Sequence, residues 1–299
     1  MSGILSFDQV SVSFALQDHT ASARAVDSVS LELNRGEIFG IVGESGSGKS
    51  TLANAVMGLL PRNANVIGSI KVNGREITGL RDDEFRSLRG NEVAMIFQDA
   101  STSLDPTWSV GDQIAETLRA HQTITRKAAK QHAIQLMTEV GITDAALRYQ
   151  DVPHRFSGGM RQRIVIAAAL ANHPKILIAD EPTTALDVTI QAQVLQLIDR
   201  IRKANGMTVL LITHDLAVVS QMCDRVAVMY GGKLIEMAAT SHLFAKPSHP
   251  YTRALLAANP ALAKPGGRLP VIPVEWSVES LKKAEQLKAL SSLPEAEHG

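Results

Sequence analysis

One short stretch of this chain combines the residue types that can hold a phosphate group. Residues 43–50 read G-E-S-G-S-G-K-S, a glycine-rich pattern that ends in lysine and serine. Glycines let a backbone curl so that several N–H groups point at one anion, and a helix starting there adds the positive end of its dipole. Lys49 then reaches the β- and γ-phosphates of a nucleotide, and Ser50 is placed to ligate Mg²⁺. The pattern predicts a nucleotide-binding loop.

The flanking residues supply the elements that such a loop needs. Residues 37–42 form an apolar run typical of a buried strand, and residues 51–57 are typical of a helix. Strand, glycine-rich turn and helix, in this order, is the context in which the pattern binds phosphate. We therefore expect a continuous set of residues to face the nucleotide: Gly43, Glu44, Ser45, Gly46, Ser47, Gly48, Lys49, Ser50 and Thr51.

A second candidate element follows at Asp180 and Glu181, directly after the apolar run 175–179. A buried strand that ends in two carboxylates places them at the carboxyl edge of a sheet, where ligands sit in open α/β folds. We expect Asp180 to hold Mg²⁺ through water and Glu181 to orient and polarise the attacking water. The alternative is that the pair merely caps a strand–helix turn, which Pro182 also favours.

Around these motifs, apolar strands alternate with amphipathic helices, which predicts a mostly parallel sheet covered on both faces. Before the loop, residues 4–42 show the alternation of short strands, and residues 109–170 indicate a helical insertion. The other expected strands are 68–74, 92–97, 175–179, 208–213 and 225–229, and the other expected helices are 190–203, 216–222 and, near the end, 280–290.

Composition narrows the class of protein. The 299 residues contain 30 Lys plus Arg and 30 Asp plus Glu, a balance that argues against a broad nucleic-acid surface. The single cysteine, Cys223, excludes a disulfide within the chain and is expected to be a reduced core residue. The longest apolar run, 164–171, is far shorter than the ~20 residues that span a bilayer. We expect any membrane association to come through a partner.

Further motifs point to a known family. Residues 156–160 read F-S-G-G-M, followed by R-Q-R, and this resembles the L-S-G-G-Q signature of ATP-binding-cassette (ABC) ATPases. Gln98, the A-L-D stretch at 185–187 and His214 complete the family's set in the family's order, over residues 4 to about 240. Two positions differ from the usual signature, Phe156 and Met160. A methionine followed by R-Q-R is also found in the peptide-importer branch, so we do not interpret it as inactivating.

The resemblance implies a role for each matching residue. Glu181, His214, Gln98 and Lys49 are expected to be catalytic, and Ser50, Gln98 and Asp180 to hold the metal. His214 is expected to donate a hydrogen bond to the γ-phosphate. The remaining implied nucleotide contacts are Phe14, which would stack on adenine unless it is simply a core strand residue, together with Ser157, Gly158, Gly159 and Asp187. The implied cofactors are ATP and Mg²⁺.

Three segments resemble one branch of the family, the dipeptide/oligopeptide/nickel importer ATPases. They are residues 43–47, 97–106 and 248–256, the last reading S-H-P-Y-T-R-A-L-L. Residues 267–273 also look like that branch's tail. The branch often continues with a cysteine cluster that binds iron–sulfur, which typically takes four cysteines. This chain has no cysteine after Cys223, so we expect the isolated subunit to be free of such a cluster.

The expected fold is therefore an α/β P-loop NTPase cassette with a mixed sheet core, an antiparallel amino-terminal β-subdomain and a helical subdomain at about 99–165. We divide the chain into an ATPase domain, 1–246, and a short accessory segment, 247–299, expected to be dispensable for ATP binding. Because the signature residues are implied to act on the opposite subunit's nucleotide, a second cassette, identical or related, is an expected partner.

The expected function is ATP hydrolysis that drives solute import, with di- or oligopeptides as the solute. The expected location is the cytoplasmic face of the plasma membrane, peripheral, on permease subunits, with an extracytoplasmic solute-binding protein as an indirect partner and no nucleic acid. Three alternatives stay open: import of nickel or another small solute, a soluble cassette acting on ribosomes or DNA, and a non-hydrolytic regulatory cassette. The last would need changes at Lys49, Glu181 or His214, and all three are intact.

Overall fold

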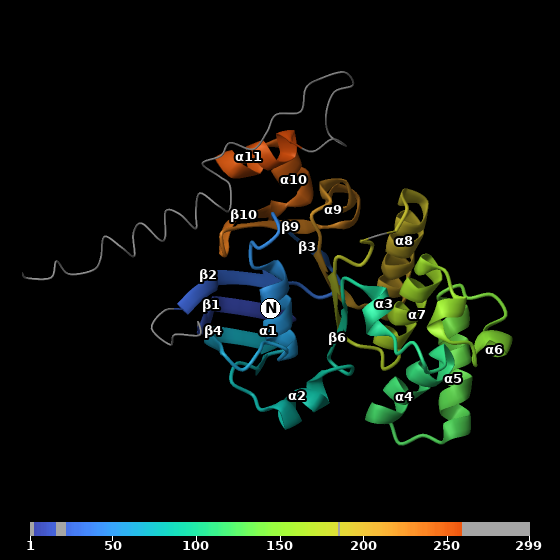
Figure 1. The fold of residues 1–299 in the computed structure, drawn as a ribbon. Coiled ribbons are helices and arrows are strands. Elements are labelled where there is room, and N and C mark those ends of the chain that lie inside the picture. Colours follow the sequence, from blue (N-terminus) through green and yellow to red (C-terminus); the bar gives the residue numbers. More distant parts are fainter. Residues whose placement is uncertain (1–2, 16–21, 185, 259–299) are drawn as a thin grey trace, which may run out of the picture.

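The computed structural model describes residues 3–15, 22–184 and 186–258 (Figure 1). Its centre is a six-stranded sheet with the order β10-β9-β3-β8-β7-β6. Neighbouring strands from β9 to β6 are parallel, and only β10 runs antiparallel, to β9. The strands are β3 (Ile38–Val42), β6 (Val93–Ile96), β7 (Ile176–Asp180), β8 (Thr208–Ile212), β9 (Arg225–Tyr230) and β10 (Lys233–Ala239).

A second, antiparallel sheet has the order β2-β1-β4-β5 and lies beside the first (Figure 1). Its strands are β1 (Leu5–Ala15), β2 (Ser22–Leu33), β4 (Ala64–Val72) and β5 (Arg75–Glu76). Helix α1 (Lys49–Met57) shares one apolar cluster with both sheets, and α2 (Asp82–Leu88) contributes two buried side chains to it.

Helices α3 to α8 form the opposite side of the molecule, at the right of Figure 1, and α10 and α11 lie at its top. Five of them, with one 3₁₀ turn at Pro153–Arg155, occupy residues 100–170: α3 (Ala100–Ser103), α4 (Val110–His121), α5 (Arg126–Glu139), α6 (Ala145–Arg148) and α7 (Gly158–Leu170). The later helices are α8 (Val188–Asn205), α9 (Leu216–Met222), α10 (Thr240–Ala245) and α11 (Pro250–Ala257).

The parallel strands are buried on both faces, which explains their continuous apolar runs. In β3, Phe39 and Ile41 belong to the cluster shared with α1, whereas Ile38 and Val42 belong to the cluster shared with the helices. This division follows from the two-residue period of a strand. Each such side chain contributes about 1.5–3 kcal/mol when fully buried, so the centre of the sheet is a rigid platform for the loops that leave its strands.

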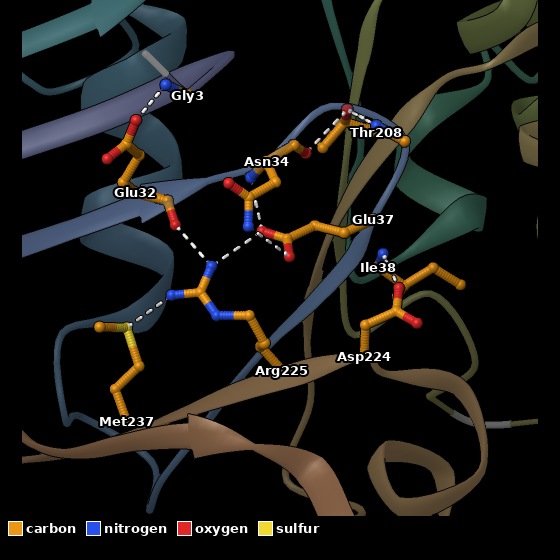
Figure 2. A network of polar contacts seen from close by, with 10 residues as sticks. Gly3, Glu32, Asn34, Glu37, Ile38, Thr208, Asp224, Arg225 and Met237 are labelled. Carbon is orange, nitrogen blue, oxygen red and sulfur yellow. Dashed lines mark hydrogen bonds and ion pairs between the residues drawn. The ribbon is translucent and has the colours of Figure 1, made fainter. Parts of the chain in front are cut away.

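The amino ends of these strands are joined by a polar network (Figure 2). Glu37, only 9% exposed, accepts hydrogen bonds from the backbone of Asn34 at 2.6 Å and from Arg225 Nη1 at 3.2 Å. Arg225 also donates to the carbonyl oxygen of Glu32 at 3.1 Å, and the Asp224 carboxylate accepts from the backbone N–H of Ile38 at 2.8 Å. The network ties the turn between β2 and β3 to the start of β9.

The mixed sheet, the antiparallel subdomain and the helical subdomain agree with the expected fold. Cys223 is a free, buried thiol, as predicted. The first helix begins at Lys49, two residues earlier than expected, because the phosphate-binding turn leads directly into it. The expected helix 280–290 and the stretch 267–273 lie outside the described residues, and the domain division at 246 stays a prediction.

Candidate active site at the carboxyl ends of the parallel strands

The loop after β3 has a shape that two of its positions allow only to glycine. Gly43 has φ +154° and Gly48 has φ +98°, both in the region that side chains disfavour. A Cβ at Gly43 would lie 2.2 Å from the carbonyl oxygen of Met229, and one at Gly48 would lie 2.4 Å from that of Ala25. The loop is therefore pressed between the end of β9 and β2.

Lys49 begins α1 and is only 6% exposed. Its ammonium reaches back over the loop and donates to the carbonyl oxygens of Gly43 and Glu44, each at 2.8 Å, and to the Ser47 hydroxyl at 3.3 Å. Burial lowers the pKa of Lys49, against the opposing effect of the nearby carboxylates. The ammonium is thus held within the loop, where it can contact an anion bound by the backbone N–H groups.

Asp180 is the last residue of β7, and its side chain is 6% exposed. Burial raises its pKa, while a hydrogen-bonding interaction with Ser50 lowers it. One carboxylate oxygen, Oδ1, is buried without a hydrogen-bond partner, which costs free energy unless a ligand supplies one. A carboxylate oxygen without a hydrogen-bond partner, beside a serine hydroxyl, fits Mg²⁺. This ion prefers oxygen ligands, and only a few of them usually come from the protein. The described residues contain no group of three or more His, Cys, Asp or Glu that could hold a metal ion.

Glu181 is the meeting point of side chains from three strand ends. His214 Nδ1 lies 3.1 Å from Oε1, while Gln98 Nε2 and Thr184 Oγ1 donate to Oε2 at 3.1 and 2.9 Å. Burial works to raise the pKa of Glu181, but the hydrogen bonds from His214 and Thr184 outweigh it and the net pKa is lowered. The carboxylate therefore stays ionised and available to accept a proton.

The backbone at Glu181 has φ +47°, the left-handed region that is uncommon for a non-glycine residue. Its N–H donates to the carbonyl oxygen of Ile212 at the end of β8, at 2.8 Å. Strain of this kind persists where the surroundings hold it in place. Here the neighbouring strand holds it, and the carboxylate is turned toward the ends of β6 and β8.

The signature residues lie elsewhere in the described chain. Ser157 caps α7 by accepting from the Met160 N–H at 3.4 Å, and Ser157 and Gly158 are exposed. In Figure 1, α7 lies on the far side of β6 and α3 from α1. The structure does not place Ser157, Gly158 or Gly159 at the chain's own phosphate loop. Phe156 is buried in the apolar core, so the replacement of leucine keeps an apolar side chain there.

A family profile for the ABC transporter matches residues 26–184, and one for the oligopeptide/dipeptide transporter carboxyl-terminal region matches residues 235–284. The chain belongs to the ABC transporter family. It is the ATP-binding, ATP-hydrolysing type of subunit, of the branch that carries the oligopeptide/dipeptide region. The predicted family, and with it the predicted ATPase activity, is confirmed.

Curated relatives agree. The chain is 48% identical over 271 residues to the dipeptide transport ATP-binding protein DppD of Bacillus subtilis, covering 90% of this chain and 80% of that protein. It is 48% identical over 288 residues to the oligopeptide transport ATP-binding protein OppD of Lactococcus lactis, covering 96% and 84%. It is 46% identical to DppD of Escherichia coli, covering 90% and 82%.

Solved structures confirm the cassette fold. The ATP-binding cassette MJ0796, in a dimeric post-hydrolysis state bound to ADP and phosphate, matches with a TM-score of 0.70 and 26% identity, covering 79% of this chain and 98% of that one. CbiO1 of Clostridium perfringens, part of an ABC transporter complex, matches with a TM-score of 0.68 and 26% identity, covering 82% and 92%.

Two expected nucleotide contacts take structural roles in this ABC subunit. Asp187 caps α8 by accepting from the Ile190 N–H at 2.9 Å. Phe14 is half-buried at the end of β1, where it pairs with Ala23 and packs at the margin of the core. Contact of Phe14 with adenine, and of Asp187 with a nucleotide, stay predictions.

Two residues that contact the site, Thr184 and Tyr251, were not among the predicted site residues. Thr184 stands three residues after Glu181 in the turn that returns to it, and this spacing was the available signal. Tyr251 belongs to α11, yet it is fully buried and interacts with Glu44 of the phosphate loop. No local pattern relates Tyr251 to Glu44. The expectation that residues 247–299 are dispensable for ATP binding stays a prediction.

Proposed function

We propose that this chain is the ATPase of an importer for di- or oligopeptides and that Glu181 is its general base. The observation that supports this most directly is the convergence of Gln98, Thr184 and His214 on one ionised carboxylate, beside a phosphate loop and a buried Asp180. Phosphoryl transfer to water needs positioning and charge neutralisation more than covalent chemistry, and these residue types supply both.

In the proposed reaction, Glu181 takes a proton from water as the water oxygen attacks the γ-phosphorus of ATP. The bond between that phosphorus and the β–γ bridging oxygen breaks, which yields ADP and phosphate. Lys49 and the backbone N–H groups of residues 43–50 hold the phosphates, and Gln98 and His214 orient the reacting groups. Ser50, Asp180 and Gln98 would hold Mg²⁺, whose charge neutralises the phosphate oxygens when it is bound.

The proposal includes a second cassette, because the serine and glycines of the signature lie away from the chain's own loop. Ser157 and Gly158 are exposed and Gly159 is half-buried at the start of α7, where backbone N–H groups and the helix dipole favour an anion. We infer that this surface completes the nucleotide site of the partner cassette, as the dimeric state named for the relative MJ0796 suggests. Asp187 faces the same interface in this proposal.

A permease contact is proposed on the helical subdomain. A surface pocket of about 380 Å³ lies between α4, α5 and the stretch before the signature, and Trp108, 43% exposed, is at its rim. Asp112, Glu116 and Arg119 add charges of both signs. A pocket of this kind suits a short cytoplasmic helix with an apolar face and a few charged residues. None of the described helices is long and apolar enough to cross a membrane, so a peripheral location at the cytoplasmic face is proposed through this contact.

Peptides are proposed as the solute because the relatives named above are dipeptide and oligopeptide transport proteins. The test is purification of the intact membrane complex, reconstitution with its binding protein in vesicles, and measurement of ATP hydrolysis with di- and oligopeptides, nickel, or no solute. Stimulation by peptides alone supports the proposal, and stimulation by nickel alone contradicts it.

Crosslinks from Trp108 to a permease subunit are expected in the same complex, whereas crosslinks confined to the β1–β4 face would contradict the permease contact.

A further inference from the structure

Helix α11 is anchored at its amino end by the hairpin of β9 and β10. The Glu236 carboxylate of β10 accepts the backbone N–H groups of Ser248 and His249, at 2.7 and 2.9 Å. The His249 ring in turn accepts the N–H of Tyr251 at 3.1 Å. These bonds give α11 a defined orientation on the cassette, beside α10 and the hairpin (Figure 1).

That orientation buries Tyr251 completely. Its ring packs on the ring of Tyr230, the last residue of β9, with 4.4 Å between the centroids and 42° between the planes. The residue before Tyr230, Met229, is the one whose carbonyl oxygen closes on Gly43. The helix therefore packs against the strand end that supports the phosphate loop.

The hydroxyl of Tyr251 lies near Glu44, inside the loop itself, and its influence opposes the rise that burial gives to the pKa of Glu44. The carbonyl oxygen of Glu44 accepts from the ammonium of Lys49 at 2.8 Å. On the other side, the N–H of Gly232, in the turn between β9 and β10, donates to the carbonyl oxygen of Ser47 at 3.2 Å. The loop is thus braced from outside by the hairpin and by one side chain of α11.

We propose that Tyr251 is a positioning residue of the nucleotide site, through which helix α11 holds the phosphate loop in its binding shape. The tyrosine touches neither nucleotide nor metal in this proposal; it acts on Glu44 and thereby on the carbonyl groups that orient Lys49. The proposal rests on the nucleotide site proposed above. It assigns to the start of the carboxyl-terminal region a task inside the ATPase domain, namely setting nucleotide affinity.

The test compares two hydroxyl deletions on the same helix in the full chain. Tyr251→Phe keeps the ring on Tyr230 and removes the hydroxyl that faces Glu44. Thr252→Val is the matched control, because Thr252 is equally buried but its hydroxyl interacts with Glu236 instead. Binding of Mg-ATP is measured by calorimetry, turnover at saturating ATP in the intact complex, and the melting temperature of each variant.

We expect Tyr251→Phe to weaken Mg-ATP binding by about two- to tenfold, the range of one hydrogen bond, with turnover at saturation unchanged. Thr252→Val should leave binding unchanged, even if it lowers the melting temperature as much. In a Glu44→Ala background the effect of Tyr251→Phe should become smaller, because the carboxylate is gone and only the backbone of residue 44 remains beside Tyr251. Unchanged binding in Tyr251→Phe, or the same loss with and without Glu44, would overturn the proposal.

A further variant, Lys49→Ala, distinguishes a failure of this inference from a failure of the proposed nucleotide site on which it rests. If Lys49→Ala abolishes binding while Tyr251→Phe does not change it, the loop binds nucleotide and α11 does not position it. If Lys49→Ala leaves binding intact, the loop assignment itself is wrong. Truncation after residue 246 removes α11 altogether, and its effect on binding counts only if the melting curve shows a folded core.

Discussion

Charged residues are buried at both edges of the six-stranded sheet, but the two edges differ in how the chain compensates those charges. At the amino edge, Glu37 is satisfied by Asn34 and Arg225, so the charge is neutralised by the chain itself (Figure 2). At the carboxyl edge, Asp180 is as buried as Glu37 and yet keeps an oxygen without a partner. The charge of Glu37 is fully compensated by the chain, whereas that of Asp180 is not.

The difference separates stability from function. A buried charge without full compensation costs several kcal/mol in general, so such a group persists in a folded protein when something else completes it. At the carboxyl edge, the completing groups are the proposed metal and nucleotide. We expect substitutions at the amino edge to change unfolding and substitutions at the carboxyl edge to change chemistry, and variants at both edges can test that contrast.

The largest effect is expected for Glu181→Gln, which keeps the shape of the side chain and removes its proton acceptor. General base catalysis contributes about 10²–10⁴-fold in rate, so turnover of the intact complex should fall by that factor while Mg-ATP binding persists. The measurement is steady-state phosphate release together with nucleotide binding. Gel filtration should also show an ATP-bound dimer that accumulates. Wild-type turnover in this variant would remove Glu181 from the role of base.

A smaller loss is expected for Lys49→Ala, which deletes the ammonium that faces the loop. Hydrogen bonds to charged groups contribute about 1.5–3 kcal/mol, so the affinity for Mg-ATP should fall by about 10- to 100-fold. Calorimetric titration of the purified full chain measures this directly. Because Lys49 is buried and its pKa is lowered by that burial, its removal should not lower the melting temperature much. A large drop in melting temperature with unchanged affinity for Mg-ATP would contradict the expectation that the carboxyl edge serves chemistry rather than stability.

The amino edge is tested by Arg225→Met, which keeps an unbranched apolar stem and leaves Glu37 without its cation. Arg225 is 28% exposed, so solvent reduces the cost of leaving the Glu37 charge without its cation. A loss of about 1–3 kcal/mol in the free energy of unfolding is expected. Urea denaturation measures it. The double variant Arg225→Met with Glu37→Gln should recover part of the loss, because the buried charge is then absent. Turnover per folded molecule should stay at the wild-type level in both.

The smallest expected effect is a change in pH dependence. The hydrogen bond from His214 helps to lower the pKa of Glu181, so the wild-type base stays ionised well into the acid range. In His214→Ala that contribution is lost, and the Glu181 pKa rises. Residual turnover should then decline at a higher pH as the solution is acidified. The profile of kcat against pH for the two proteins measures the displacement, and a displacement toward lower pH would contradict the expected rise of the Glu181 pKa.

The nucleotide loop and the strand with its two carboxylates were predictable because each is a local pattern. Residues 43–50 combine a strand end, a glycine-rich turn and a helix start, and the chemistry follows from backbone geometry over eight neighbouring positions. The alternation of strands and helices and the buried cysteine were predictable from apolar runs and residue counts, and the cassette fold was implied by the resemblance of the motifs to the ABC family. The sequence by itself thus determined which residue types are available for chemistry and in what order.

Only the tertiary structure decided which of them meet. Gln98 reaches Glu181 across a separation of 83 residues because β6 and β7 are neighbours in the sheet, and His214 reaches it from β8. Tyr251 lies near Glu44 because the hairpin of β9 and β10 holds α11 against the end of β9, next to the phosphate loop. Such contacts depend on strand order and helix docking, which arise from burial summed over the whole core. A single segment does not contain that information, so the role of α11 became visible only in the folded chain.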